Sequence, residues 1–333
     1  MPLIETSSFN PSILVRPAAV QTMFPSVARR LGDPGFRREI LELPDGDFLE
    51  LDWLTGDSQC LAIVNHGLEG STASTYLRGM ASALRTAGYD VLTWNMRGCG
   101  TERNRLPTWY HSGQSDDLRA VISRALQVHK GPVVLVGFSI GGNILLKYLG
   151  EEGASISPRI RSAVAISVPI ELATSADELA KPSNAIYMNY LIKPLRERMR
   201  EKASRIPELF DVQGLDSLKN FHEFDARYTA PMHGFSSIYD YWEKASSLNY
   251  LPSIAIPTLL VSALDDPFLS PACFPRDIAQ QSKNLFLETP KHGGHVGFIT
   301  GLSLQSTWVE RRTLEFVSSH LGERNPTQLR VWA

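Results

Sequence analysis

The hydrophobic positions from about residue 39 onward fall into short apolar runs separated by amphipathic stretches. In EILELPDGDFLELDWL (39–54), apolar positions alternate on either side of Asp45 and Gly46. An Asp-Gly pair between two alternating stretches indicates a β-hairpin. Later apolar runs predict strands, at 60–67, 90–98, 132–139, 161–169, 257–266 and 284–290. Because these runs are apolar on both faces, they suit a parallel sheet covered by helices on each side.

Amphipathic stretches between these strands predict helices, at 73–87, 113–129, 141–152 and 303–321. The alternation of strand and helix predicts an α/β fold with a doubly wound, mostly parallel sheet and an antiparallel hairpin at its leading edge. One long segment, about 170–252, has no clear strand and carries Met, Tyr, Arg and Lys at helical spacing. We interpret it as a helical cap insertion over the carboxyl edge of the sheet, because it is too long for an ordinary connection. The alternative is a set of sheet-flanking helices in a larger fold.

Composition changes this picture little. The 333 residues are 43% hydrophobic and 20% charged, which is typical of a soluble globular protein with a sizeable core. Residues 1–35 are polar and interrupted by prolines, so we expect an N-terminal arm packed along a domain that spans 36–333. The formal charge of −2 gives no electrostatic case for nucleic acid or for an anionic membrane surface.

The cysteines and the N-terminus bear on location. Three scattered cysteines, Cys60, Cys99 and Cys273, are too few for a disulfide framework or a zinc site, so we expect a reduced, cytoplasmic setting without a bound metal. The N-terminus lacks the pattern of a signal peptide, and no apolar run approaches the ~18 to 20 residues needed to span a bilayer. A peripheral membrane contact is left open.

The strongest chemical motif is Gly137-Phe138-Ser139-Ile140-Gly141, which follows a predicted strand and opens a predicted helix. It fits the G-x-S-x-G pattern, in which a sharp strand-to-helix turn exposes a serine hydroxyl at the top of a sheet. The five-residue pattern alone is weak, but its context is much less common. Ser139 is therefore a candidate nucleophile, supported by Gly137 and Gly141.

A serine hydroxyl becomes a nucleophile only when a base takes its proton and a third group orients that base. At this kind of turn the expected chain order is serine, acid, histidine. Asp265 and Asp266 follow a late strand, and His292 and His295 lie in the glycine-rich loop PKHGGHVGF. We favour Asp266, which precedes Pro-Phe as a turn-initiating acid would. We favour His295 because it follows two glycines, whereas His292 lies beside a lysine and is expected to be solvated.

Acyl-transfer chemistry also needs hydrogen-bond donors for a developing oxyanion. One candidate is the backbone N–H of Ile140, at the start of a helix whose dipole favours negative charge. The second is the N–H of Leu68, in the loop that starts His66-Gly67. We assign His66 a loop-stabilising role rather than that of a general base. Cys99 in RGCG is not chosen as a nucleophile, since no base for it is evident.

Five stretches together resemble one known family. NHGLEGS, WNMRGCG, GFSIGGNILLKYLGEEG, SALDDPF and HGGHVGF, in this order, resemble the YheT-like branch of the α/β-hydrolases, also called the AB hydrolase 4 family. The resemblance extends over about residues 10–321. It implies an α/β-hydrolase fold and carboxylic-ester hydrolysis, including lipid esters and phospholipids in some members. It also implies a triad of Ser139, Asp266 and His295, with no metal or organic cofactor.

The sequence thus predicts a serine hydrolase that cleaves a small-molecule or lipid ester through an acyl-enzyme. Apolar residues of the expected cap favour an uncharged or lipid-like acyl group: Ile186, Tyr187, Met188, Tyr190, Leu191 and Ile192. The same triad would serve a thioesterase, an acyltransferase or a peptidase, and a binding protein could keep the fold without turnover. Nucleotide binding is disfavoured, since GFSIGGN matches neither G-x-G-x-x-G nor a P-loop. The oligomeric state is left open.

Overall fold

A computed structural model describes residues 3–321, so residues 1–2 of the expected arm and 322–333 of the expected domain lie outside it. The described chain forms one nine-stranded sheet in the order β1-β9-β8-β7-β6-β4-β5-β3-β2. The strands are β1 (Leu3–Ile4), β2 (Arg37–Glu42), β3 (Phe48–Leu54), β4 (Leu61–Asn65), β5 (Asp90–Asn95), β6 (Val133–Phe138), β7 (Ile160–Ile166), β8 (Thr258–Val261) and β9 (Leu285–Glu288).

The predicted fold class is confirmed. β2 and β3 pair in antiparallel register, with Glu42 opposite Phe48, and β3 pairs antiparallel with β5. The strands from β5 across to β1 pair in parallel. The hairpin therefore forms one edge of a mostly parallel sheet, as the alternating pattern around Asp45 and Gly46 predicts.

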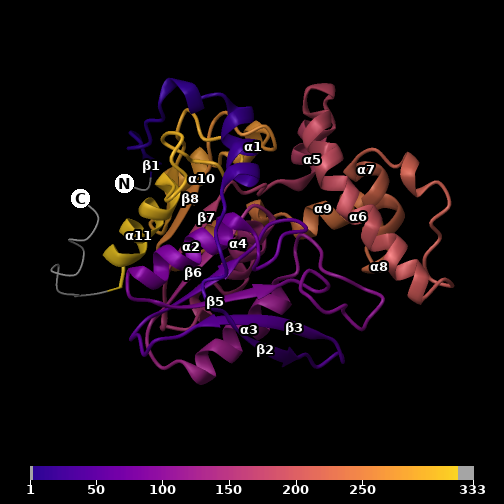
Figure 1. Ribbon diagram of the computed structural model, residues 1–333, viewed down its shortest axis with the longest axis horizontal. Coiled ribbons are helices and arrows are strands. Elements are labelled where there is room, and N and C mark those ends of the chain that lie inside the picture. The colour runs from indigo at the N-terminus through magenta and orange to yellow at the C-terminus, as the bar shows by residue number, and fades with distance from the viewer. Residues whose placement is uncertain (1–2, 322–333) are drawn as a thin grey trace.

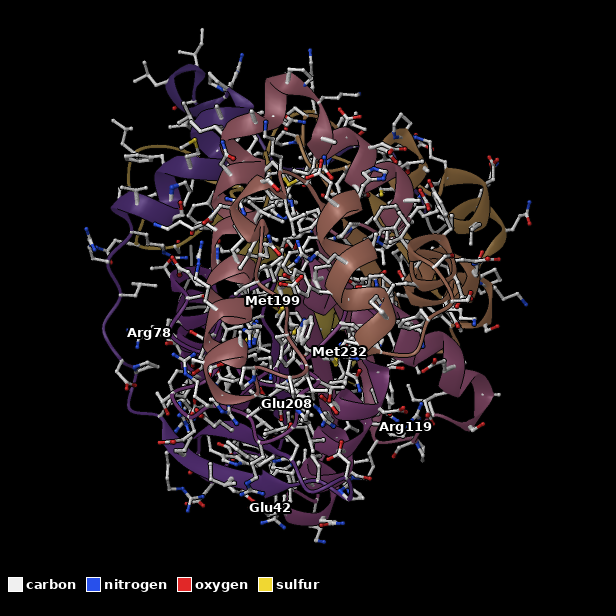
Figure 2. The ribbon with its side chains drawn as sticks, turned by 90° about the vertical axis from the view of Figure 1, so that its right-hand side faces the viewer. Glu42, Arg78, Arg119, Met199, Glu208 and Met232 are labelled. Carbon is white, nitrogen blue, oxygen red and sulfur yellow. The ribbon has the colours of Figure 1, made fainter. Side chains whose placement is uncertain are left out.

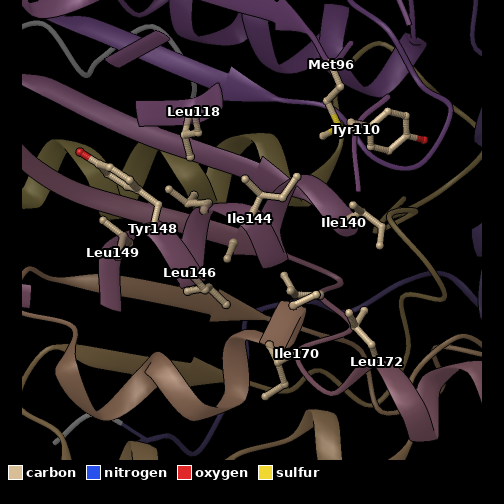
Figure 3. Packing of buried hydrophobic residues seen from close by; sticks show 14 of the residues in the cluster. Met96, Tyr110, Leu118, Ile140, Ile144, Leu146, Tyr148, Leu149, Ile170 and Leu172 are labelled. Carbon is tan, nitrogen blue, oxygen red and sulfur yellow. The ribbon is translucent and has the colours of Figure 1, made fainter. Parts of the chain in front are cut away.

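Helices cover both faces of this sheet (Figure 1). Along β6, Val133 and Leu135 pack into one apolar cluster, while Val134 and Val136 pack into a second cluster on the opposite face. The first cluster includes residues of α3 (Ser115–Val128) and α4 (Ile140–Glu152), and Figure 3 shows Leu118, Ile144, Tyr148 and Leu149 within it. The second includes residues of α2 (Thr75–Thr86) and α11 (Trp308–Ser319). Burial on both faces explains why the strands are apolar throughout.

One strand and two α-helices were not predicted. The two-residue strand β1 pairs with β9 at the edge opposite the hairpin, and it is too short to give a sequence pattern. Within the expected arm, α1 (Ala18–Ala28) forms although it contains Pro25, and the proline obscured its periodicity. A short helix, α10 (Arg276–Gln281), lies between β8 and β9.

Between β7 and β8 the chain forms five α-helices, several short 3₁₀ or π-helical turns and no strand. The α-helices are α5 (Leu172–Ala180), α6 (Ala185–Arg205), α7 (Phe221–Phe224), α8 (Ala230–Met232) and α9 (Ile238–Ala245). In Figure 1 these helices gather to one side of the sheet, away from α2, α3 and α11. Figure 2 turns this side toward the viewer and labels Met199 of α6 and Met232 of α8.

None of the helices within residues 3–321 combines the length and the apolar character needed to cross a membrane.

Candidate active site

Ser139 occupies a strained turn between β6 and α4. Its backbone has φ 52° and ψ −123°, in a region that residues with a side chain rarely adopt. The flanking glycines permit this turn: a Cβ on Gly137 would lie 2.7 Å from the Gly141 carbonyl oxygen, and one on Gly141 would lie 2.2 Å from the His66 carbonyl oxygen. Backbone therefore approaches backbone where only glycine fits. The arrangement has the form of the nucleophile turn that the sequence predicts.

His295 and Asp266 meet Ser139 in a continuous hydrogen-bonded chain. The Nε2 atom of His295 lies 3.0 Å from Ser139 Oγ, within hydrogen-bond distance. Its Nδ1 atom lies 3.1 and 2.9 Å from the two carboxylate oxygens of Asp266. The Asp266 side chain is fully buried, and that of His295 is 10% exposed. A buried carboxylate on one ring nitrogen leaves the other free to accept the serine proton.

The competing acid and histidine form a pair of their own beside this chain. His292 Nδ1 lies 3.3 Å from Asp265 Oδ2, and Asp265 Oδ1 accepts a hydrogen bond of 2.9 Å from the Gly294 N–H. Burial raises the pKa of the Asp265 carboxyl above its ordinary value. The structure thus brings Asp266 and His295, the two residues favoured from the sequence, to Ser139. Asp265 and His292 instead connect the histidine loop to the loop that follows β8.

Phe268 has a part in this geometry that the sequence analysis missed. Its ring stacks on the His295 imidazole, with centroids 4.0 Å apart and planes at 22°. Its backbone N–H donates a hydrogen bond of 2.9 Å to Asp266 Oδ1. One residue therefore holds both the acid and the plane of the imidazole. The Pro-Phe that follows Asp266 was the available signal.

The loop 66–71 lies directly against the nucleophile. A Cβ on Gly67 would lie 3.2 Å from Ser139 Cβ, so a larger residue there would crowd the serine. The loop is held by two tyrosine hydroxyls: Tyr76 accepts from the Gly67 N–H at 2.8 Å, and Tyr110 accepts from the Glu69 N–H at 2.8 Å. Neither hydrogen bond was predicted from the sequence: Tyr110 was expected only as a core or pocket-wall residue, and Tyr76 was not singled out.

Two backbone donors near Ser139 are left without a protein partner. Within residues 3–321, the N–H groups of Leu68 and Ile140 make no hydrogen bond to another group of the chain. Ile140 is the first residue of α4, where helix geometry leaves an N–H unsatisfied. Both were the oxyanion donors expected from the sequence, and both remain free to bind a ligand oxygen.

Both ring nitrogens of His66 make hydrogen bonds to backbone groups in and near this loop. Its Nε2 accepts a 3.0 Å hydrogen bond from the Met96 N–H, so the proton lies on Nδ1, 2.7 Å from the Gly67 carbonyl oxygen. Complete burial lowers the pKa of His66 to about 4, which keeps the ring neutral at physiological pH.

Burial also raises the pKa of the Cys99 thiol to about 12, so this thiol stays protonated. These environments fit a loop-stabilising His66 and an inert Cys99.

A cavity of about 730 Å³ opens onto Ser139 and His295. Its walls come from the loop 66–71, from α1, and from α5, α6 and α9 of the segment between β7 and β8. Most of the lining is apolar, for example Leu172, Leu179, Leu191 and Trp242. In Figure 3, Ile140 and Leu172 lie toward the same end of the core cluster. Among the described residues, no group of three or more His, Cys, Asp and Glu side chains could hold a metal ion.

A nucleophile turn, a partnered histidine and free backbone donors above a doubly wound sheet define the class of α/β-hydrolase-type proteins. In sequence, residues 63–302 match the family model of the alpha/beta hydrolase fold. A curated Escherichia coli (strain K12) relative, "Putative esterase YheT", is 34% identical over 317 residues, which cover 92% of each chain. The chain therefore belongs to the α/β-hydrolase family, in its YheT-like branch, and the predicted resemblance is confirmed.

Other comparisons agree with this assignment. The bovine (Bos taurus) "Phospholipase ABHD3" is 29% identical over 296 residues, which cover 85% of this chain and 72% of the relative. Among solved structures, the Pyrococcus furiosus esterase Pf2001 superposes with a TM-score of 0.58 at 19% identity, covering 88% of this chain and 99% of that one. At that identity the structural likeness shows the fold alone.

Proposed function

We propose that this protein is a serine hydrolase that cleaves carboxylic esters through an acyl-enzyme. One observation carries the proposal, the unbroken hydrogen-bonded chain from Asp266 through His295 to Ser139. The names of the relatives, an esterase and a phospholipase, support the same class of reaction.

In the first half-reaction, Ser139 Oγ attacks the ester carbonyl carbon while His295 Nε2 takes the hydroxyl proton. Asp266 accepts from Nδ1–H, which fixes the tautomer and stabilises the imidazolium that forms. The carbonyl oxygen gains negative charge and would bind the N–H groups of Leu68 and Ile140, at the positive end of the α4 dipole. His295 then gives its proton to the leaving alkoxide, and an acylated Ser139 remains.

The second half-reaction repeats this chemistry with water. His295 removes a proton from a water molecule, whose oxygen attacks the acyl carbon. The tetrahedral intermediate uses the same two donors, and its collapse returns the proton to Ser139 Oγ and releases the acid. The substrate's alcohol and acid thus leave in separate steps.

The cavity supports an acyl group that is uncharged or lipid-like. Its volume of about 730 Å³ falls in the ~300–1,000 Å³ range of small-molecule sites, and its lining is predominantly apolar. Burying each CH₂ group of an acyl chain there would contribute ~0.8 kcal/mol to binding. We therefore place the acyl chain against the helices between β7 and β8, which we propose act as a cap.

A fluorophosphonate probe tests the nucleophile directly, because it reacts covalently with an activated serine. We expect the wild-type protein to be labelled at Ser139 and the Ser139→Ala variant to remain unlabelled. A folded wild-type protein that is not labelled would contradict the proposal and would favour a binding protein that keeps the fold without turnover.

A panel of esters that differ only in acyl-chain length tests the substrate class. We expect kcat/KM to rise from acetyl to medium-length acyl groups and to exceed the values for matched charged acyl groups. Activity confined to acetyl esters would contradict the lipid-like assignment. Thioesters and acceptor alcohols in the same assay distinguish a thioesterase and an acyltransferase from an esterase.

A further inference from the structure

We propose that the N-terminal helix α1 is a working part of the active site, in which Thr22 positions His295 for proton transfer. This inference rests on the proposed function, because it concerns the residue that we assign as the base. Thr22 touches no reacting atom in this scheme and acts through the backbone of His295.

The loop that carries His295 has an unusual backbone. Gly293, Gly294, Val296 and Phe298 all have positive φ, at 147°, 54°, 62° and 47°. Positive φ is costly for the two residues with β-carbons, and such conformations persist only when the surroundings hold them in place. The position of the imidazole therefore depends on contacts from outside the loop.

α1 supplies one such contact at the histidine itself. The backbone N–H of His295 donates a 3.0 Å hydrogen bond to Thr22 Oγ1, and this hydroxyl donates its own proton to the Ala18 carbonyl at 2.8 Å. The hydroxyl is thus oriented by its helix so that a lone pair faces His295. From the other side, the Val296 N–H donates to Ser167 Oγ at 3.0 Å. Two consecutive amides on either side of the imidazole are fixed by side chains from distant elements.

A second residue of α1 holds the helix against this loop. Gln21 is fully buried, donates to the carbonyls of Val15 and Ile299 at 2.7 and 2.9 Å, and accepts from the Ile299 N–H at 2.9 Å. The helix and the loop also approach closely: a Cβ on Gly294 would lie 2.6 Å from Thr22 Oγ1, and one on Gly297 would lie 2.1 Å from the Gln21 carbonyl oxygen. This contact leaves little room for the loop to shift.

The same helix forms part of the cavity wall. Thr22, Met23, Ser26 and Val27 line the cavity together with Ser139 and His295. At the end of the helix, Arg29 makes a buried ion pair with Glu310 of α11, with Nη1 and Oε1 2.6 Å apart. In Figure 1, α1 lies between the C-terminal loops and α5. The helix is therefore held by Gln21 within its first half and by Arg29 just after its last residue, and it reaches both the histidine and the cavity.

Thr22→Val tests the inference, because valine keeps the shape of threonine and removes the hydroxyl. Thr22→Ser restores the acceptor, and Thr22→Ala serves if the valine variant does not fold. Thr86→Val is a matched control: Thr86 Oγ1 donates to the Ser82 carbonyl at 2.8 Å, the same local bond as in Thr22, but on an exposed face of α2 far along the chain from the histidine loop. For each protein we would measure kcat and KM on a short-chain ester, the rate of fluorophosphonate labelling and the Tm.

We expect Thr22→Val to lower kcat and the labelling rate by roughly 10-fold, with KM nearly unchanged; a 1 Å misplacement of a catalytic group costs up to ~10²-fold. Thr22→Ser should regain most of the wild-type kcat, and Thr86→Val should match the wild type.

A kcat for folded Thr22→Val or Thr22→Ala equal to that of the wild type would overturn the inference. Equal losses in Thr22→Val and Thr86→Val, or no rescue by serine, would overturn it too, because they would indicate a general effect on the fold. A wild-type protein that neither turns over esters nor reacts with the probe would instead refute the proposed function.

Discussion

Arg198 of α6 forms a two-bond ion pair with Glu69 of the candidate oxyanion loop, with Nε–Oε1 and Nη2–Oε2 distances of 3.0 and 2.9 Å. Both side chains are nearly buried, at 8% and 12% exposure. Arg198 also donates to the Gly98 carbonyl at 3.0 Å, and Tyr110 donates to Glu69 Oε1 at 2.9 Å. These hydrogen bonds connect helix α6 to Glu69, the residue that follows Leu68. The backbone of Glu69 has a positive φ of 49°.

We expect Arg198→Gln to lower kcat by about 10- to 100-fold, because an unanchored Glu69 would let the Leu68 N–H move; losing one oxyanion donor outright costs ~10² to 10³. The free energy of unfolding should fall by roughly 3 kcal/mol, since the carboxylate of Glu69 would be left nearly buried and unpaired. Steady-state kinetics and urea denaturation measure the two effects.

Arg200→Gln is the control for this change. Arg200 lies on the same helix and pairs with Asp216 at the surface, where ion pairs contribute ~0–1 kcal/mol. Similar kinetics for the Arg198 and Arg200 variants would show that the pair with Glu69 has no role in catalysis.

The two adjacent aspartates should differ sharply in function. Asp266→Asn should reduce kcat by about 10⁴-fold, because the amide would favour the wrong imidazole tautomer, as in other serine triads. Asp265→Asn should reduce it by less than about 10-fold, since asparagine can still accept from the Gly294 N–H. The ratio of the two kcat values on one ester decides the assignment, and a ratio near one would reject Asp266 as the orienting acid.

Gly141→Ala has two opposing effects on the free energy of unfolding, a gain in helix propensity and a loss from steric contact. Alanine in place of a helical glycine favours the helix by roughly 1 kcal/mol. Here its Cβ would lie 2.2 Å from the His66 carbonyl oxygen, a backbone atom that cannot turn aside. We expect a net loss of about 2 kcal/mol or more in the free energy of unfolding, measured by chemical denaturation. Gly301→Ala, whose Cβ would meet nothing within 4 Å, is the control. A stabilised Gly141→Ala variant would show that the close approach to His66 is absent.

Asp225 should make stability depend on pH. Asp225 is one of the residues that line the cavity, and complete burial raises the pKa of its carboxyl from 3.8 to about 6 despite hydrogen bonds from Thr229 and the Trp242 indole. Between these two pH values the folded protein holds a proton that the unfolded chain has released. The stability that the neutral carboxyl contributes is therefore present at pH 4 and lost as the pH rises through about 6.

Asp225→Asn removes this titration, and its amide can accept from Trp242 while the Thr229 hydroxyl turns to accept from the amide nitrogen. The difference in free energy of unfolding, variant minus wild type, should rise between pH 4 and pH 7.5 by up to about 3 kcal/mol. Urea titrations at several pH values give this difference. A difference that does not change with pH would mean that the carboxyl titrates near its ordinary pKa.

Much of the fold follows from patterns confined to short stretches of chain. Continuous apolar runs such as those of β4 and β6 predicted strands because the sheet is buried on both faces, and Asp45-Gly46 predicted the hairpin because few residues suit its turn. Gly137, Ser139 and Gly141 were recognisable together because one sharp turn imposes their spacing. Each of these signals reflects geometry that neighbouring residues determine among themselves.

The contacts that position the chemistry come from residues far apart in the sequence, and only the tertiary structure decided them. Thr22 meets His295 across 273 positions, and Glu69 meets Arg198 across 129. Asp265 and Asp266 are adjacent in sequence and differ in partner because the backbone after β8 turns one carboxylate toward His292 and the other toward His295. Such pairings depend on how packed elements are placed relative to one another, and composition and periodicity do not encode that placement locally. The sequence by itself determined the sheet apart from its short edge strand β1, the turn and the candidate residue types, while packing decided which of them meet.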